Sequence, residues 1–207
     1  MNKKYFGTDG IRGLANSYPI TSDFFTKLAY CLSKSIIKSK YKKVFIGKDT
    51  RISCDMIESS LIAGFLTMGI DCFQLGQVPT PLVSFMTKKK DADLGIMISA
   101  SHNPYQDNGI KIFNNKGDKL KDEEEKKIEE LIEKSNTLKF IKPLSIGKLK
   151  KYDSDFYDYK QSIKKAIPKN ISFKGLKVVL DCAHGAAYKI GPEILLHHGV
   201  DLIPINI

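Results

Sequence analysis

A serine followed by hydrogen-bond donors and a lysine stands near the middle of the sequence. Ser101 is followed directly by His102 and Asn103, and Lys111 comes ten residues after the serine. The short apolar run at 94–98 predicts a buried strand that ends just before them. A serine at the carboxyl end of such a strand lies where open α/β sheets place their ligands. The donors and the lysine cation would suit an anion.

Two interpretations of this serine are open on chemistry alone. A free serine hydroxyl is a weak nucleophile and needs a base or another activator. Ser101 is therefore either a nucleophilic or phosphorylated residue, or part of a local turn in which Ser101 and Asn103 only hydrogen-bond their neighbours. Ser99 could face the same side, since residues alternate along a strand.

The two arginines are a second chemical signal. Of the 33 basic residues, 31 are lysines, and the exceptions are Arg12 and Arg51. A planar guanidinium can bind two phosphate or carboxylate oxygens at once, which a lysine cannot reproduce. Arg12 lies in the glycine-rich segment 6–13, which we expect to be a loop. It could contact a ligand or only pair with Asp9.

Strand and helix patterns alternate up to about residue 140, which predicts a three-layer α/β/α domain with a mostly parallel, mixed sheet. The hairpin that starts at 110 would add an antiparallel strand. The expected strands are 44–46, 70–75, 94–98 and 110–113, and the expected helices are 21–39, 53–69, 80–90 and one from 122. Loops 47–52 and 99–108 follow strand ends and should converge with loop 6–13 in one site.

A second, incomplete domain is expected at the end of the chain. We predict a first domain at 1–142, a connection at 143–154 and the start of a second, similar domain at 155–207. The expected elements of that last part are a helix at 155–167, a strand at 176–180, a helix at 188–198 and a strand at 200–205. With only part of a sheet, it should be loosely ordered or prone to aggregate through its edge. His184, His197 and His198 are expected in solvent or core, not as ligands.

Composition excludes several classes of protein. Apolar residues make up 42% of the chain, which indicates a globular core. The sequence has no apolar run long enough to span a membrane and no signal-peptide core. Four cysteines without metal-ligand spacing indicate reduced thiols and a cytoplasmic protein. The net charge of +10 comes from scattered lysines, without an aromatic-interleaved basic stripe, and so favours neither nucleic acid nor membrane as a partner.

Four motifs together resemble one enzyme family. Ser-Ala-Ser-His-Asn-Pro with Asp-Asn-Gly-Ile-Lys resembles the phosphoserine loop of the α-D-phosphohexomutases. The other three motifs follow the same order as in that family and cover nearly the whole chain: Phe6 to Gly13, Gly47 to Ser53 and Asp181 to Ala187. The first of them is similar to the signature of the bacterial phosphoglucosamine mutase branch.

The resemblance implies an activity for the complete enzyme. It would convert glucosamine 6-phosphate to glucosamine 1-phosphate through a phosphoserine and a bisphosphate intermediate, with a sugar bisphosphate as activator. Its product would feed UDP-N-acetylglucosamine and cell-wall precursor synthesis. Family members have four domains, so we expect this chain to be the N-terminal part and to be inactive alone. The alternatives are a phosphomannomutase/phosphoglucomutase, or a non-catalytic remnant that needs its missing C-terminal domains as a partner chain.

The resemblance also implies roles for individual residues. Ser101 would carry the phosphate and be one ligand of Mg²⁺, whose carboxylate ligands in the family lie in a part that this chain lacks. The other residues carried over are catalytic Arg12, Lys111 and His102, and the phosphate-binding Asn103, Lys48 and Arg51. Lys111 would be a candidate acid or base.

Overall fold

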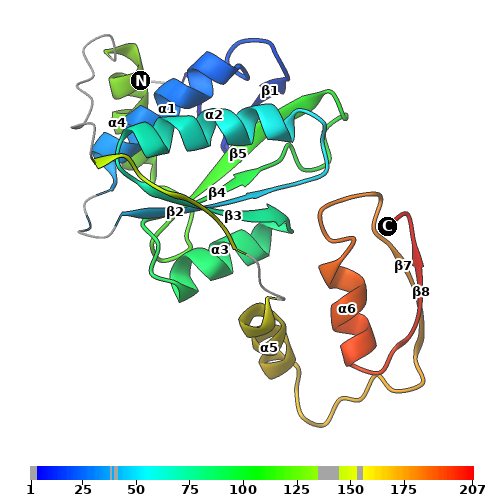
Figure 1. The fold of residues 1–207 in the computed structure, drawn as a ribbon. Helices are drawn as coiled ribbons and strands as arrows, with labels where there is room; N and C mark the ends of the chain where they lie inside the picture. The colour runs from blue at the N-terminus through cyan, green and yellow to red at the C-terminus, as the bar shows by residue number, and fades with distance from the viewer. Residues whose placement is uncertain (1–3, 38, 40–41, 135–144, 153–155) are drawn as a thin grey trace.

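A six-stranded mixed sheet forms the centre of the first part of the chain (Figure 1). The computed structural model describes residues 4–37, 39, 42–134, 145–152 and 156–207. In the order β1-β5-β4-β2-β3-β6, the strands are β1 (Ile11–Leu14), β5 (Asp107–Asn114), β4 (Leu94–Ile98), β2 (Lys43–Lys48), β3 (Asp71–Gln77) and β6 (Leu149–Lys151).

Strand direction agrees with the expected mixed sheet. The strands β4, β2, β3 and β6 are mutually parallel, and β5 runs antiparallel to both β4 and β1. The sheet is therefore parallel except for β5, which is the predicted hairpin strand. The carboxyl ends of β2, β3 and β4 consequently meet at one edge.

Two expectations about loops were wrong. Segment 6–13, expected to be a loop throughout, contains the start of β1, which pairs with β5. Residues 149–151, inside the predicted connection, form β6 at the other edge of the sheet. Both strands are short, so neither has enough residues to show a period of two. The predicted boundary at 142–143 lies outside the described residues.

Helices cover both faces of the sheet. In Figure 1, α1 (Ser22–Ser35) and α2 (Cys54–Thr67) lie on one face, with α4 (Asp122–Glu133) beside α1, and α3 (Thr80–Lys89) lies on the other. The layers follow from helix spacing, since the buried residues of α1 recur every three or four positions. This is the predicted three-layer arrangement.

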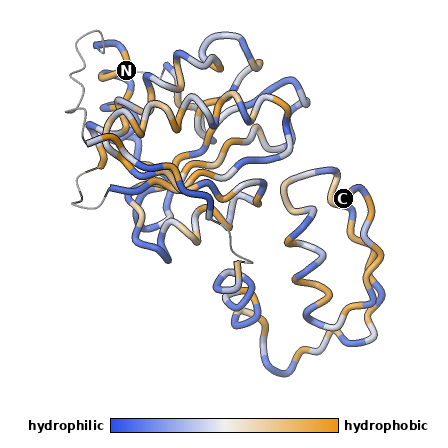
Figure 2. The backbone as a smooth tube through the Cα atoms, viewed as in Figure 1, coloured by the Kyte–Doolittle hydropathy of each residue, from blue (hydrophilic) through white to orange (hydrophobic). Residues whose placement is uncertain are grey.

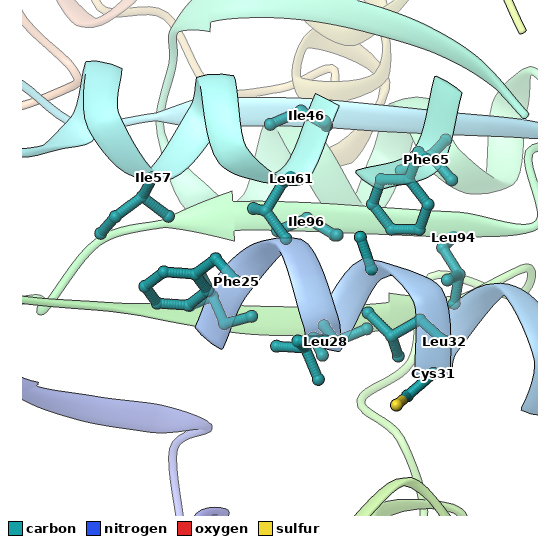
Figure 3. Packing of buried hydrophobic residues seen from close by; sticks show 14 of the residues in the cluster. Phe25, Leu28, Cys31, Leu32, Ile46, Ile57, Leu61, Phe65, Leu94 and Ile96 are labelled. Atoms are coloured by element: carbon teal, nitrogen blue, oxygen red, sulfur yellow. The ribbon is translucent and has the colours of Figure 1, made fainter. Parts of the chain in front are cut away.

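The larger core fills the space between the sheet and its α1–α2 face (Figure 3). Phe25 and Leu28 of α1 and Leu61 and Phe65 of α2 are fully buried there and lie over Ile96 of β4. Gly64 allows the two helices to approach, because a Cβ at that position would come within 2.7 Å of the Thr26 carbonyl oxygen.

Helix ends agree with the predictions to within a few residues. Gly69, with φ +74, follows the end of α2 as expected of a helix-terminating glycine. Thr21 and Ser53 precede α1 and α2, and neither makes a side-chain capping hydrogen bond. On α4 the Glu124 carboxylate accepts a hydrogen bond from the backbone N–H of Lys121, one residue before the expected start.

The last part of the chain is a small βαβ unit. It comprises α5 (Tyr157–Ala166), β7 (Lys177–Asp181), α6 (Ile190–His197) and β8 (Asp201–Ile205), with β7 and β8 parallel. Apolar segments of β7 and β8 stand out in Figure 2, although both strands are largely exposed. Over the described residues, no helix combines the length and hydrophobicity that crossing a bilayer requires.

Candidate active site

The serine loop begins where β4 ends and presents Ser101 to solvent. Ser101 is exposed and adopts a left-handed backbone with φ +59, which is uncommon for a residue other than glycine. Ser99 is buried, and its Oγ accepts a hydrogen bond of 2.9 Å from the Ser101 N–H. Both serines line the cavity, but they differ in accessibility, since Ser101 is exposed and Ser99 is buried.

A cavity of about 940 Å³ opens in front of this serine. It is formed by four segments: the loop after β2, the start of α3, the serine loop and the loop after β7. The residues around it include Asp49, Arg51, Thr80, Ser101, His102, Asn103, Tyr105 and His184. Three strand ends and a helix start thus contribute to one hollow, as expected for an α/β sheet.

Arg12 and Lys111 project from the sheet face that α3 covers. In an antiparallel pair, directly opposite residues share a face. Arg12 is opposite Gly109, and Lys111 is opposite Met97, which packs in the core beneath α3. Gly109 is required here, because a Cβ would lie 2.1 Å from the Ile11 carbonyl oxygen.

Arg12 pairs with Asp9 and also contacts the serine loop. Its NH2 donates to Asp9 Oδ2 at 3.3 Å, and its NH1 donates to Asn103 Oδ1 at 3.2 Å. Its buried Nε has no hydrogen-bond partner in the structure. Arg12 is therefore paired with Asp9 and also directed to the serine loop, so that loops 6–13 and 99–108 converge as expected.

The Lys111 ammonium group is partly buried and has a second positive charge near it. Burial lowers the pKa of its ammonium group, and the positive charge of Arg12 lowers it further. A lowered pKa is one property that a lysine acid or base needs, and that role of Lys111 stays a prediction.

His102 and Asn103 continue the serine loop. The Nδ1 of His102 lies 3.4 Å from Ser101 Oγ, and the imidazole is exposed. The Asn103 side chain accepts from Arg12 and donates to Asp107 Oδ2 at 3.0 Å. Both residues line the cavity, and their roles toward a phosphate stay predictions.

Arg51 lies beneath the same loop. It donates to Asp49 Oδ2 at 3.1 Å and to backbone carbonyl oxygens of the loop. Its position beside Ser101 agrees with the prediction that the loop after β2 takes part in the site. Its partners are protein atoms, so direct phosphate binding by Arg51 stays a prediction.

Lys48 is directed elsewhere. Its Nζ lies 2.6 Å from Asp55 Oδ1 and 2.6 Å from Glu58 Oε2, both on α2. Burial alone would lower the pKa of Lys48, but the two carboxylates outweigh it and raise the pKa. Lys48 does not line the cavity, so its predicted phosphate contact has no support in this geometry.

The described residues do not form a Mg²⁺ site by themselves. No group of three His, Cys, Asp or Glu side chains comes together in them as a metal site requires. The nearest buried carboxylate in the cavity wall, Asp49, is neutralised by Arg51 and also accepts from the Arg51 N–H. The predicted role of Ser101 as a Mg²⁺ ligand stays a prediction.

The loop after β7 is the motif at 181–187, and its His184 is exposed, which agrees with the expectation of solvent or core, but the contribution of this loop to the cavity was not predicted. His184, expected in solvent or core, lines the cavity opposite Ser101's loop, and its backbone oxygen accepts a 2.6 Å hydrogen bond from Thr50 Oγ1. Tyr188 also donates to Gln77 at 2.8 Å. The available signal was position, because Asp181 ends a parallel strand and the following residues face the ligand edge.

The chain is similar to known proteins over its whole length. The family described as "Phosphoglucomutase/phosphomannomutase, alpha/beta/alpha domain I" matches residues 3–139. The chain is 44% identical to a phosphoglucosamine mutase of Sinorhizobium medicae and 46% identical to one of Brucella anthropi, over 207 residues. It covers 46% of each relative, so it spans about half their length.

A solved structure shows the same fold. The crystal structure of a putative phosphomannomutase from Thermus thermophilus superposes with a TM-score of 0.80 at 27% identity, over 99% of this chain and 46% of that one. The similarity thus extends beyond the first sheet to the βαβ unit at the end of the chain.

Proposed function

Because this chain belongs to the phosphoglucomutase/phosphomannomutase family, we propose that it supplies the phosphoserine part of a phosphoglucosamine mutase, of which it would be the N-terminal part. The observation that carries the proposal is the position of Ser101, exposed in a left-handed turn at the end of β4 and facing the cavity. The curated relatives favour glucosamine phosphate over other hexose phosphates as the substrate.

The reaction moves one phosphoryl group at a time. Phosphorylated Ser101 would transfer its phosphoryl group to the free hydroxyl of glucosamine 6-phosphate: the P–Oγ bond breaks, and a bond from phosphorus to the sugar oxygen forms. The sugar hydroxyl loses a proton and the serine oxygen gains one. The bisphosphate then returns its 6-phosphate to Ser101, which leaves glucosamine 1-phosphate and restores the enzyme.

Catalysis of phosphoryl transfer depends mainly on positioning the reacting groups and on stabilising their negative charge. Arg12, held between Asp9 and Asn103, would stabilise negative charge on the moving group. Lys111, with its lowered pKa, would exchange the proton with the sugar hydroxyl. His102 would help to hold the phosphate through its imidazole beside Ser101 Oγ.

Other components would have to be added to this site. Mg²⁺ requires carboxylates that the described residues do not bring to Ser101, and a sugar bisphosphate would load the serine first. The four cysteines, all free, support a cytoplasmic location. Since the family members compared here are about twice as long, we expect no turnover from these 207 residues alone.

The first experiment uses the chain extended to the length of its relatives. Phosphopeptide mapping after incubation with glucosamine 1,6-bisphosphate should find phosphate on Ser101. Ser101→Ala should abolish conversion of glucosamine 6-phosphate, because it removes the covalent step. Ser59→Ala on the exposed side of α2 is the matched control and should keep full turnover. Phosphate on Ser99 with Ser101 unmodified would refute the assignment.

A second experiment concerns Arg12. Arg12→Lys keeps the charge but removes the planar fork, and the loss of one hydrogen-bond donor to transition-state charge costs about 2.7–4 kcal/mol in an oxyanion hole. Turnover per folded molecule should therefore fall about a hundred- to a thousand-fold while the melting temperature changes little. Near-normal turnover in the folded variant would leave Arg12 with only its structural contacts to Asp9 and Asn103.

The runner-up is a phosphomannomutase/phosphoglucomutase. The fold match to a putative phosphomannomutase is the observation that favours it. Measuring kcat/KM with glucosamine, glucose and mannose 6-phosphates in the same extended protein distinguishes the two candidates. A preference for mannose or glucose phosphate would reject the glucosamine assignment and keep the phosphoserine mechanism.

A further inference from the structure

Ser101 is held in its left-handed conformation from both sides of its peptide unit. A residue with a side chain adopts such a backbone at a cost and persists there only when its surroundings determine it. Its N–H is bound by the buried Ser99 hydroxyl at 2.9 Å. Its carbonyl oxygen accepts a 3.0 Å hydrogen bond from Arg51 NH2.

The same guanidinium binds the rest of the serine loop. NH2 also donates to the Asn103 carbonyl at 2.8 Å. NH1 donates to the carbonyls of Pro104 at 2.6 Å and Asp107 at 2.9 Å, where the loop re-enters the sheet as β5. With Nε bound to Asp49, all five N–H groups of Arg51 have acceptors.

Asp49 fixes this guanidinium at its other end. Its Oδ2 accepts from Arg51 Nε, and its Oδ1 accepts from the Arg51 N–H at 3.0 Å and from Cys54 Sγ at 3.1 Å. The Asp49 N–H donates to the Ile98 carbonyl at the end of β4. The Asp49 and Arg51 side chains are only 11% and 10% exposed, so solvent screens this network weakly.

We infer that Arg51 is a positioning residue that clamps the serine loop and so presents Ser101, in place of acting as a phosphate ligand. Its nitrogens have no N–H left for a phosphate oxygen, whereas they span the loop from Ser101 to Asp107. The catalytic consequence rests on the proposed function. The clamp, meaning the hydrogen bonds from Arg51 to the serine loop, does not depend on that function, because it involves only protein atoms.

Sequence composition supports the inference independently. In a chain that uses 31 lysines, arginine is kept at this position. Lysine has three N–H donors around one nitrogen and cannot reach four carbonyls and a carboxylate in a fixed fork. Arg51→Lys would therefore keep the charge and leave loop carbonyls without partners.

The clamp is tested by chymotrypsin on the 207-residue chain. Tyr105, 83% exposed at the tip of the loop, is the reporter site, and Tyr157 on α5, 61% exposed, is the internal reference. A single hydrogen bond to a charged group shifts local opening by about ten-fold, so Arg51→Lys should raise the Tyr105/Tyr157 cleavage ratio at least about ten-fold. Arg12→Lys, the same change at the other arginine, affects one hydrogen bond to the loop, from Arg12 NH1 to Asn103 Oδ1, and should raise the ratio less than Arg51→Lys does.

Two further measurements separate local from global opening. Cleavage at Phe65, fully buried in the larger core, reports unfolding of the whole domain and should stay undetectable. If Arg51→Lys also exposes Phe65, Asp49→Asn replaces it as the test variant. That change weakens one contact of the guanidinium and should raise the ratio to an intermediate value. An unchanged ratio in a folded Arg51→Lys or, failing that, in Asp49→Asn overturns the clamp.

The catalytic part is tested in the extended protein. Arg51→Lys should lower kcat for phosphate exchange at Ser101 about ten-fold or more with KM nearly unchanged, because a displaced nucleophile affects the chemical step. A raised KM with normal kcat would instead make Arg51 a substrate ligand and overturn the inference. A wild-type protein that takes up no phosphate refutes the proposed function, and the cleavage ratio then still decides the clamp.

Discussion

The two parts of the chain use the same alternation of strands and helices but bury it to different extents. The sheet of β1–β6 has apolar cores on both faces, with residues such as Leu61 and Phe65 fully buried. In residues 156–207, only Ile190 and Val200 are buried apolar residues. Val179 and Ile203, which pair across β7 and β8, are 60% and 46% exposed.

An apolar sequence pattern therefore predicts that a strand favours burial, but the strand is buried only where another element covers it. Two parallel strands can bury one sheet face under α6, while the other face has nothing above it within the described residues. Hydrophobic stabilisation depends on area removed from water, about 25 cal/mol per Å², and an uncovered strand gains little of it. Figure 2 shows the same apolar colour in the central strands of the first sheet and in β7 and β8.

Amide hydrogen exchange should show the largest difference between the two parts of the chain. Amides of β2 and β4, paired on both sides in the first sheet, should open only with global unfolding, whereas those of β7 and β8 should open locally. We expect protection factors at least about a thousand-fold higher in β2 and β4, since global stability is about 5–15 kcal/mol. Equal protection in the two sheets would show that the small unit folds with the large one.

Replacing one leucine by alanine in each part of the chain should give the next largest difference between the two parts. Leu61→Ala in α2 should lower the free energy of unfolding by about 2–5 kcal/mol, because it leaves a cavity in a closed core. Leu196→Ala in α6, where the side chain is 57% exposed, should cost less than about 0.5 kcal/mol. Urea denaturation measures both, and similar losses at the two positions would contradict the comparison.

Replacing one glutamate by glutamine in each part of the chain should give a smaller difference in stability between the two parts. Glu129 Oε1 accepts hydrogen bonds from three successive backbone N–H groups, of Lys4, Tyr5 and Phe6, at 2.7–3.0 Å. Glu129→Gln weakens all three and should cost about 1.5–3 kcal/mol of unfolding free energy.

The matched control is the surface ion pair of the second part, in which Lys160 Nζ lies 3.2 Å from Glu193 Oε2. Glu193→Gln should change stability by less than about 1 kcal/mol, because exposed ion pairs are screened and flexible. A loss as large as that of Glu129→Gln would mean that the second part depends on its surface charges for stability.

The smallest expected change in stability is on the uncovered face of β7 and β8. Ile203→Thr should alter the unfolding free energy by no more than about 0.5 kcal/mol, since the side chain is already half in water. Light scattering should nevertheless show less self-association, because the exposed apolar surface shrinks. A large loss of stability would indicate that Ile203 is covered in solution.

The sequence by itself determined the elements and the edge of the sheet that carries the site. Helix periodicity located α1 and α2, short apolar runs located β2, β3 and β4, and the strand-end rule brought the loops of Arg51 and Ser101 together. These inferences succeed because hydrophobic periods and turn residues are local properties of the chain. The site residues' chemical roles stay predictions.

Only the tertiary structure decided which partners each residue has. β1 and β6 became strands because β5 and β3 offered unpaired edges to them, which no local pattern in three or four residues can reveal. Lys48 pairs with two carboxylates of α2. The five N–H groups of Arg51 donate to acceptors as far as 56 residues away in the sequence. Partners so distant are chosen by how the strands align in the folded sheet, and that alignment depends on the whole packed domain.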